Sequence, residues 1–155
     1  MEREEYKIIV DQYSDMVTRI AIMNVKNIDD AKDCYQNVFM KLYCYKKKFD
    51  DHEHIKAWLI RVTINECKDY QKQFWKRNIN IDEIIIGRED EKLVILPLVM
   101  KLASKYRNVL YLYYYEGYSI NEIADILTEN PNTIKSQLAR GRKLLKKKLG
   151  EDFYE

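Results

Sequence analysis

The chain has 155 residues with 27 basic and 25 acidic side chains, so its formal net charge is only +2. This length accommodates one medium domain or two small ones, and 4 glycines and 2 prolines leave little material for tight hairpins or phosphate-binding loops. The composition predicts an all-α protein and argues against a large two-layer enzyme fold. No apolar run approaches the roughly 18 to 20 residues that cross a bilayer, and the acidic first residues do not resemble a signal peptide, so we expect a cytoplasmic protein without membrane insertion.

The cysteines and histidines do not form a recognisable metal-binding pattern. Cys34, Cys44 and Cys67 occur without a C-x-x-C pair, and we interpret them as reduced structural thiols. His52 and His54 are two residues apart, a spacing that suits a strand better than a helix, and no third ligand follows at a metal-site interval. We therefore predict a solvated loop around the histidines, no metal and no cofactor. Since nucleotide-binding loops and Ser/His/Asp arrangements are also missing from the sequence, we do not expect an enzyme.

The first half of the sequence shows three stretches of helical periodicity. Apolar residues recur at three- and four-residue intervals over 6–21 and again over 31–42, where Asp29 can cap the second helix. A third helix is predicted over roughly 53–76, and the segment 46–52 before it breaks the periodicity. These stretches predict a small domain of three amphipathic helices.

An acidic stretch divides the sequence into two blocks. Residues 78–92 contain an acidic cluster and the first glycine, and we predict a linker there. The predicted organisation is therefore two small helical domains, 1–77 and 93–155. The second domain is expected to begin with a helix near 93–103 and to continue with another from about 105 to 116.

The most informative pattern lies in the second block. Ser119 and Glu122 have the spacing of a capping box, which starts a short helix. After a break at 128–129, Asn130 and Pro131 supply a cap and a proline at the first position of a final helix. Two helices joined by a tight turn match the helix-turn-helix arrangement of DNA-binding domains.

The final helix, expected to end at about Leu149, has the most distinctive charge distribution in the chain. Seven cations and no anion lie between residues 130 and 149, and Gly141 would allow a neighbouring helix to approach closely. Because Lys and Arg donate to guanine and Gln suits adenine, the outward face of this helix is predicted to read duplex DNA. The residues predicted to contact the duplex are Thr133, Lys135, Ser136, Gln137, Arg140 and Lys143.

Aromatic and cationic side chains are mixed along the third predicted helix. Trp58 can be interpreted as a core residue, but an aromatic ring near Arg61, Asn65 and Lys68 also suits stacking on unpaired bases. The two blocks together predict one domain that binds duplex DNA and one that binds separated strands.

Nearly the whole chain resembles the extracytoplasmic-function (ECF) class of bacterial RNA polymerase sigma factors. Residues 30–39 are similar to the part of sigma region two that binds the coiled coil of the largest polymerase subunit. Residues 57–62, together with Phe49, Asn65, Asp69 and Arg77, are similar to the part that melts and reads the minus-ten element. Residues 118–127 and 133–142 are similar to sigma region four, which reads the minus-thirty-five element.

The resemblance implies partners and roles for individual residues. The implied partners are core RNA polymerase, promoter DNA as duplex and as single strand, and an anti-sigma factor, often membrane-bound in this family. Thr128 departs from the family, whose turn often has glycine at this position. The residues implied in polymerase binding are Asp33, Gln36, Asn37, Phe39 and Lys41. The residues implied in capture of the melted strand are Phe49, Lys56, Trp58, Arg61, Asn65, Lys68 and Asp69.

Two other functions are compatible with the same residues. A stand-alone helix-turn-helix regulator would bind duplex DNA without polymerase. A helical interaction protein would use its basic C-terminal helix on RNA or on an anionic membrane. Run-off transcription with core polymerase separates these alternatives from a sigma factor.

Overall fold

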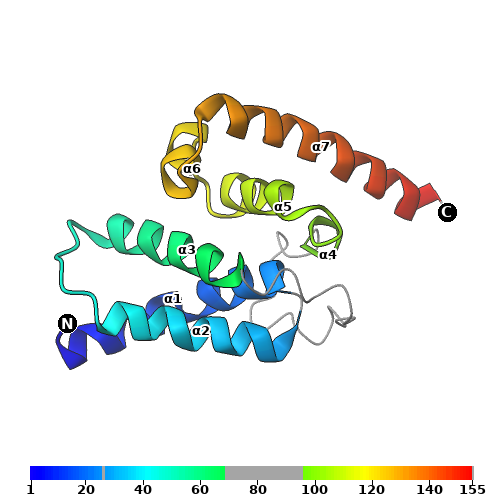
Figure 1. Ribbon diagram of the computed structural model, residues 1–155. Coiled ribbons are helices and arrows are strands. Elements are labelled where there is room, and N and C mark those ends of the chain that lie inside the picture. The colour runs from blue at the N-terminus through cyan, green and yellow to red at the C-terminus, as the bar shows by residue number, and fades with distance from the viewer. Residues whose placement is uncertain (26, 69–95, 155) are drawn as a thin grey trace. The chain divides into compact units, whose positions relative to one another are not determined.

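The computed structural model describes residues 1–25, 27–68 and 96–154, and every element within these ranges is helical (Figure 1). The chain divides into two compact units, Met1–Gly87 and Arg88–Glu155. The predicted all-α class with two helical units is therefore confirmed.

Parts of the sequence-based prediction concern residues outside these ranges. They are the linker at 78–92, the domain ends at 77 and 93, and the last predicted turns of the third helix, 69–76. Among the helices of the described ranges, none combines the length and the apolar character needed to cross a membrane.

The first unit contains three helices that pack against one another: α1 (Arg3–Val25), α2 (Ile28–Tyr43) and α3 (His52–Lys68). α2 and α3 lie side by side and are joined by the loop 44–51 (Figure 1). Val17, Leu42 and Leu59, one from each helix, are fully buried at the centre of the unit. Burial of each such side chain contributes about 1.5 to 3 kcal/mol, so this shared core holds the three helices together.

The cap of α2 differs from the prediction. Asn27 is the N-cap in an extended conformation, and its Oδ1 accepts hydrogen bonds from the N–H groups of Asp29 (2.9 Å) and Asp30 (3.2 Å). The prediction that Asp29 caps this helix is wrong, because the helix begins one residue before it. Asp29 lies instead in the first turn, where its charge faces the positive end of the helix dipole.

Two of the three cysteines lie in the core of the first unit. Cys34 of α2 and Cys67 of α3 are buried, Cys44 is exposed, and all three are free thiols. A hydrogen bond to Cys34, together with burial, raises the pKa of the Cys67 thiol above its ordinary value. The Cys67 thiol is therefore held in the protonated, unreactive form that suits a structural role.

The second unit is built from five elements: α4 (Leu96–Val99), α5 (Ser104–Leu110), the π-helix η4 (Tyr111–Tyr115), α6 (Ile120–Leu127) and α7 (Pro131–Tyr154). The helix predicted near 93–103 is wrong in its extent, because α4 ends at Val99 and a turn follows. Met100 and Leu102 are both buried there. The N–H groups of Lys101 and Leu102 donate to the carbonyls of Leu98 (3.2 Å) and Val99 (3.0 Å), an interval of three residues, and Ala103 is extended, so the chain leaves the helix there.

The helix predicted from about 105 to 116 is present, but its last turn is wider than an α-helix. The N–H of Glu116 donates to the carbonyl of Tyr111 at 3.1 Å, the five-residue interval of a π-helix. Within η4, Tyr111 and Leu112 are buried while Tyr114 is exposed. The wide turn thus places tyrosines both in the core and at the surface.

The helix-turn-helix of α6 and α7 forms as the sequence predicts. Ser119 Oγ accepts from the N–H of Glu122 (3.1 Å), and the N–H of Ser119 donates to Glu122 Oε1 (3.0 Å), which completes the capping box. Asn130 Oδ1 accepts from the N–H of Asn132 (2.8 Å) at the start of α7. α7 continues to Tyr154 rather than ending at about 149, since an isolated glycine costs a helix only about 1 kcal/mol.

Packing of α7 on α5 depends on a glycine, as predicted. A Cβ added at Gly141 would lie 3.2 Å from Cδ1 of Leu110 and 3.5 Å from Cβ of Tyr106. Ile134 and Leu138 are buried on the same side of α7. The line of contact through these three positions determines which side of α7 remains in solvent.

A buried arginine connects α5 to the turn after α4. The Arg107 side chain is only 2% exposed, and its Nη1 donates to the carbonyl of Met100 at 3.3 Å. Desolvation lowers the pKa of this guanidinium to about 10, so it stays charged at neutral pH. The hydrogen bond supplies a donor to a carbonyl that the short α4 leaves without a helical partner.

Thr128 is the strained residue of the turn between α6 and α7. Its φ of 56° and ψ of 52° lie in the left-handed region, which is unfavourable for a β-branched side chain. Thr128→Gly should raise the free energy of unfolding of the second unit by about 1 kcal/mol. The substitution removes the strain energy of the folded state, and this gain exceeds the free energy by which the greater conformational entropy of glycine stabilises the unfolded chain. Hydrogen exchange at the amides of α6 and α7 measures this change.

Gly117 provides the opposite control, since it also has a positive φ, of 78°, and no atom lies within 4 Å of an added Cβ. Gly117→Ala should therefore destabilise the unit without a steric clash. Equal exchange rates in Thr128→Gly and the unchanged protein would contradict the assignment of strain.

Candidate nucleic-acid interface

Four aromatic rings gather where the loop 44–51 meets the start of α3. The rings of Tyr45 and Phe49 stack at 4.6 Å with an interplanar angle of 20°. Trp58 lies 5.0 Å from Tyr45 and 5.7 Å from Phe49, and His54 meets the edge of Phe49 at 5.1 Å. All four are half-buried. The structure thus brings the predicted residues Phe49 and Trp58 together and adds two that sequence reasoning missed, Tyr45 and His54.

The first turn of α3 shapes the loop beside these rings. His54 Nδ1 accepts from the N–H of Asp50 (3.0 Å), and the N–H of His54 donates to Oδ1 of Asp51 (2.8 Å). His52 and His54 therefore belong to a helix and not to the solvated loop that their spacing suggested. The reason is that Asp51 supplies the acceptor that the first turn of a helix needs.

One side of α3 continues the aromatic cluster with polar groups. Trp58, Arg61, Asn65 and Lys68 follow one another at intervals of three, four and three residues, so they share one face of the helix. The last three are exposed. Lys56, also predicted to contact the melted strand, is half-buried and lies on another side of α3, and Asp69 lies outside the described residues.

Exposed residues of α2 form a second surface in the first unit. Asp33, Gln36 and Asn37 are exposed as predicted. Met40, which sequence reasoning missed, lies between these residues and the end of α2, and it is 65% exposed. The interval of seven residues from Asp33 to Met40 was a usable signal, since it places both on one helix face. Phe39 is only 3% exposed, so its side chain packs in the core and is not available to a partner.

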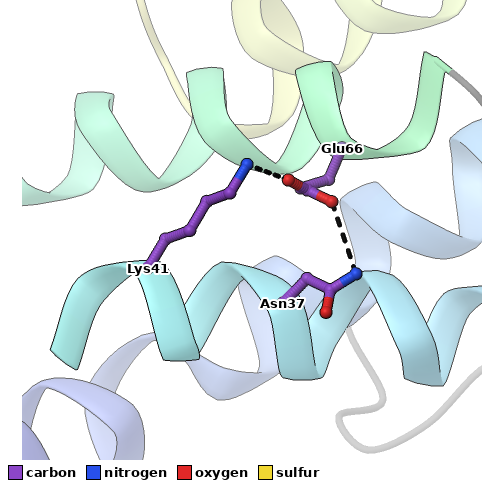
Figure 2. A network of polar contacts seen from close by, with 3 residues as sticks. All are labelled: Asn37, Lys41 and Glu66. Carbon is purple, nitrogen blue, oxygen red and sulfur yellow. Dashed lines mark hydrogen bonds and ion pairs between the residues drawn. The ribbon is translucent and has the colours of Figure 1, made fainter. Parts of the chain in front are cut away.

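Asn37 and Lys41 are held by a residue of α3. Glu66 lies between the two helices, where Lys41 forms an ion pair with Oε1 and Asn37 Nδ2 donates to Oε2 at 3.4 Å (Figure 2). Glu66 is a further residue that sequence reasoning missed, because the pairing spans 25 and 29 positions in the chain. The ion pair orients both side chains but contributes little stability, since the Lys41 side chain is 57% exposed.

α7 presents its predicted side chains on more than one side. Ser136, Arg140 and Lys143 are exposed on the outward face, while Thr133 and Gln137 are half-buried at its edge. Lys135 is exposed too, but five residues of helix rotate it by about 140° from Arg140. Sequence reasoning missed Asn132, which is exposed on the same outward face as Ser136, four residues later.

The capping box gives the start of α6 its own electrostatic signature. The Ser119 backbone N–H, with a smaller contribution from the Ser119 side chain, holds the pKa of the Glu122 carboxyl below its ordinary value. The negative charge also lies in the first turn, where it faces the positive end of the helix dipole. The box thereby fixes the beginning of the helix that supports α7.

Comparisons with known proteins agree with this architecture. The family model "Sigma-70 region 2" matches residues 9–77, and "Sigma-70, region 4" matches residues 93–145. Together the two matches include the aromatic cluster, the exposed face of α2 and most of α7. The chain belongs to the ECF class of the sigma-70 family. As an ECF sigma factor, it serves promoter-specific initiation of transcription by RNA polymerase.

Relatives of this sigma factor extend over nearly its whole length. It is 27% identical to the ECF RNA polymerase sigma factor SigW of Bacillus subtilis, over 96% of this chain and 90% of SigW. It is 29% identical to the sigma factor SigV of the same organism, over 86% of this chain and 84% of SigV. The matches therefore cover both units.

Two solved structures share the fold of this sigma factor. The sigma factor RpoE from Bartonella quintana, solved in complex with the anti-sigma factor NepR, has a TM-score of 0.74 and 22% identity, over 94% of this chain and 97% of RpoE. CnrH, solved in complex with the cytosolic domain of CnrY, has a TM-score of 0.69 and 19% identity, over 97% of this chain and 91% of CnrH.

The lowered pKa of Glu122 makes the stability of α6 depend on pH. A carboxyl whose pKa is lower in the folded state stabilises that state above its ordinary pKa, and this contribution is lost as the pH falls through the folded pKa. Ser119→Ala keeps the backbone N–H and removes only the smaller side-chain contribution, so we expect it to bring the pKa of Glu122 part of the way back to its ordinary value, as followed by carbon NMR of the carboxyl group. In the unchanged protein, protection of the α6 amides from hydrogen exchange should fall at low pH, and in Glu122→Gln this fall should be lost. If protection in Glu122→Gln still falls with pH as it does in the unchanged protein, Glu122 is not the group responsible.

Proposed function

We propose that the two units of this sigma factor divide promoter recognition between them. The unit with α6 and α7, expected to span 93–155, reads the duplex minus-thirty-five element. The unit with α1 to α3, expected to span 1–77, binds core polymerase and holds the melted minus-ten strand. The observation that carries the proposal is the continuous surface on α3, where stacked aromatic rings are followed by Arg61, Asn65 and Lys68.

The aromatic cluster has the chemistry of a site for unpaired bases. Stacking of a base on an aromatic side chain contributes about 1 to 3 kcal/mol. A base that leaves the DNA helix exchanges lost stacking for such contacts, and no covalent bond changes. Asn65 and Arg61 would then donate to base edges or phosphates next to the rings. Because these steps involve binding alone, the sigma factor itself is not an enzyme, and polymerase makes the RNA.

The exposed face of α2 is the proposed contact with core polymerase. Asp33, Gln36 and Asn37 offer polar groups around the apolar side chain of Met40. Glu66 holds Asn37 and Lys41 in fixed orientations, so fewer rotamers are lost when a partner binds. This proposal places Phe39 beneath the contact surface, where it supports α2 from the core.

α7 is the proposed reader of duplex DNA. In helix-turn-helix domains the residues near the start of the second helix meet base edges in the major groove. Ser136 and Arg140 lie on the outward face there, and Arg140 can donate twice to guanine. Gln137 and Thr133 lie at the edge of this face, and Lys135 and Lys143 supply charge toward phosphates.

Regulation by an anti-sigma protein is part of the proposal. RpoE was solved with the anti-sigma factor NepR, and the present chain shares its two-domain fold. We propose that an anti-sigma partner also keeps this sigma factor from polymerase in the cytoplasm. A membrane-anchored partner of that kind would hold it at the membrane.

Arg140→Ala tests the duplex-reading role. Since a bidentate contact to guanine is worth about 1 to 3 kcal/mol, the variant should lower holoenzyme affinity for the promoter roughly 5- to 150-fold and weaken the footprint over the upstream element. Run-off transcription with purified core polymerase supplies the second readout. The matched control is Lys101→Ala, an exposed cation outside α7. No promoter-dependent initiation by the unchanged protein would leave a stand-alone regulator or an interaction protein as the function.

Asn65→Ala tests capture of the melted strand. The variant should bind core polymerase normally but open the promoter less, because it loses the polar group that follows the aromatic cluster on α3. Permanganate reactivity of thymines in the melted region measures opening, and Tyr45→Ala should reduce it as well. Gln12→Ala, an exposed amide on α1, is the matched control. Normal permanganate reactivity in both site variants would contradict the proposed strand site.

A further inference from the structure

The surface beside the reading face of α7 holds an arginine in a fixed orientation. The guanidinium carbon of Arg142 lies 5.5 Å from the ring centroid of Tyr113 and 5.6 Å from that of Tyr114. Its Nε donates to the hydroxyl of Tyr114 at 2.5 Å. The two rings meet edge to face, with centroids 4.9 Å apart and an interplanar angle of 78°. The π-helix η4 therefore supplies both walls of a site that holds one guanidinium.

The contacts of Arg142 leave part of its donor set available. The hydroxyl of Tyr114 occupies Nε, and among the described residues the two terminal nitrogens have no hydrogen-bond or ion-pair partner. Arg142 is exposed, and Tyr114 is 52% exposed. A guanidinium oriented in this way presents two parallel N–H groups, the geometry that matches a phosphate or a carboxylate. Preorganisation by the rings reduces the side-chain entropy that binding would cost.

Two lysines extend the charge along the same flank of α7. Lys135 precedes Arg142 by seven residues and Lys146 follows it by four, so all three lie on one side of the helix, over a length of about 16 Å. Both lysines are exposed, and neither η4 nor residues 130–149 contribute an acidic side chain. Arg140 is rotated by about 200° from Arg142, so it lies at the edge of the outward face that is farthest from Arg142. Cations therefore border the outward face of α7 on both sides.

This distribution matches the surroundings of a helix in a DNA groove. The major groove is about 12 Å wide, close to the diameter of a helix with its side chains, and a sugar-phosphate backbone runs along each edge. We propose that Arg142, oriented by Tyr113 and Tyr114 and flanked by Lys135 and Lys146, binds backbone phosphates of one promoter strand. Arg140 faces the bases and the other strand. The inference rests on the proposed role of α7 in reading the minus-thirty-five element.

A phosphate backbone fits this flank better than an acidic protein does. The three cations are spaced along the same helix that carries the reading face, so a duplex bound there must come close to them. Phosphates also repeat along the strand, so a row of cations about 16 Å long can meet more than one of them. An acidic protein segment is the other ligand that this chemistry accepts, and the experiment separates the two.

The test measures coupling between Arg142 and individual phosphates. Holoenzyme is assembled from the full chain and core polymerase and bound to a promoter duplex that it has selected from a random library. Single phosphates of the duplex are replaced by neutral methylphosphonates. Neutralising the phosphate that Arg142 contacts should weaken binding of the unchanged protein by roughly tenfold, but should have little effect on Arg142→Gln. The slope of log affinity against log salt should also fall by about one in this variant.

Tyr114→Phe separates orientation from charge. It keeps the aromatic ring and the charge of Arg142 but removes the hydroxyl that accepts from Nε. The variant should lose part of the coupling at the same phosphate and keep the salt slope. Lys101→Gln, which removes an exposed charge elsewhere in the second unit, should leave both quantities unchanged.

Four outcomes would overturn the inference. If Arg142→Gln lowers the stability of the second unit but shows no phosphate coupling, Arg142 is only a connection between α7 and η4. If it weakens assembly with core polymerase and leaves DNA affinity unchanged, the ligand is an acidic protein segment. If Arg140→Ala lowers promoter affinity but no phosphate couples to Arg142, only this inference fails. If neither Arg140→Ala nor Arg142→Gln changes promoter affinity, α7 does not bind the duplex and the proposed function fails as well.

Discussion

The close packing of α7 on α5 decides how the second unit meets its surroundings. The absence of a side chain at Gly141 lets Leu110 approach, and Ile134 and Leu138 are buried along the same line. Once that line is in the core, every other residue of α7 has its direction set by the helical repeat. The reading face around Arg140 and the flank around Arg142 are both consequences of this one contact.

In the first unit, polar contacts add orientation to a core that apolar burial already holds together. Glu66 reaches from α3 to two side chains of α2, and His54 ties the loop 44–51 to the start of α3. These interactions are exposed or partly exposed, so they contribute little to stability. Their effect is to place the groups that a partner would meet: the polar face of α2 on one side, and the stacked rings of Tyr45 and Phe49 on another.

Much of this architecture could be predicted because it depends on neighbours along the chain. The capping box of Ser119 and Glu122 and the cap at Asn130 require only groups within three residues, so the pattern of side chains is sufficient to locate them. The predictions of a cap and of a helix length were wrong where two local conformations were both compatible with the sequence. Asn27 and Asp29 are both good caps, and after Val99 the chain forms a tight turn that leads to an extended Ala103, although the composition favoured a longer helix.

By itself, the sequence determined the helical class, the turn between α6 and α7, and the concentration of cations on the last helix, since each follows from local propensity, capping and charge. Only the tertiary structure decided which rings stack, that Phe39 lies in the core, and that Tyr113 and Tyr114 hold Arg142. Such contacts join residues that are far apart in the sequence: Tyr113 and Arg142 are 29 positions apart, as are Asn37 and Glu66. They depend on how the helices pack and on the wide turn of η4, and the periodicity of apolar residues along the chain predicts neither the packing nor the turn.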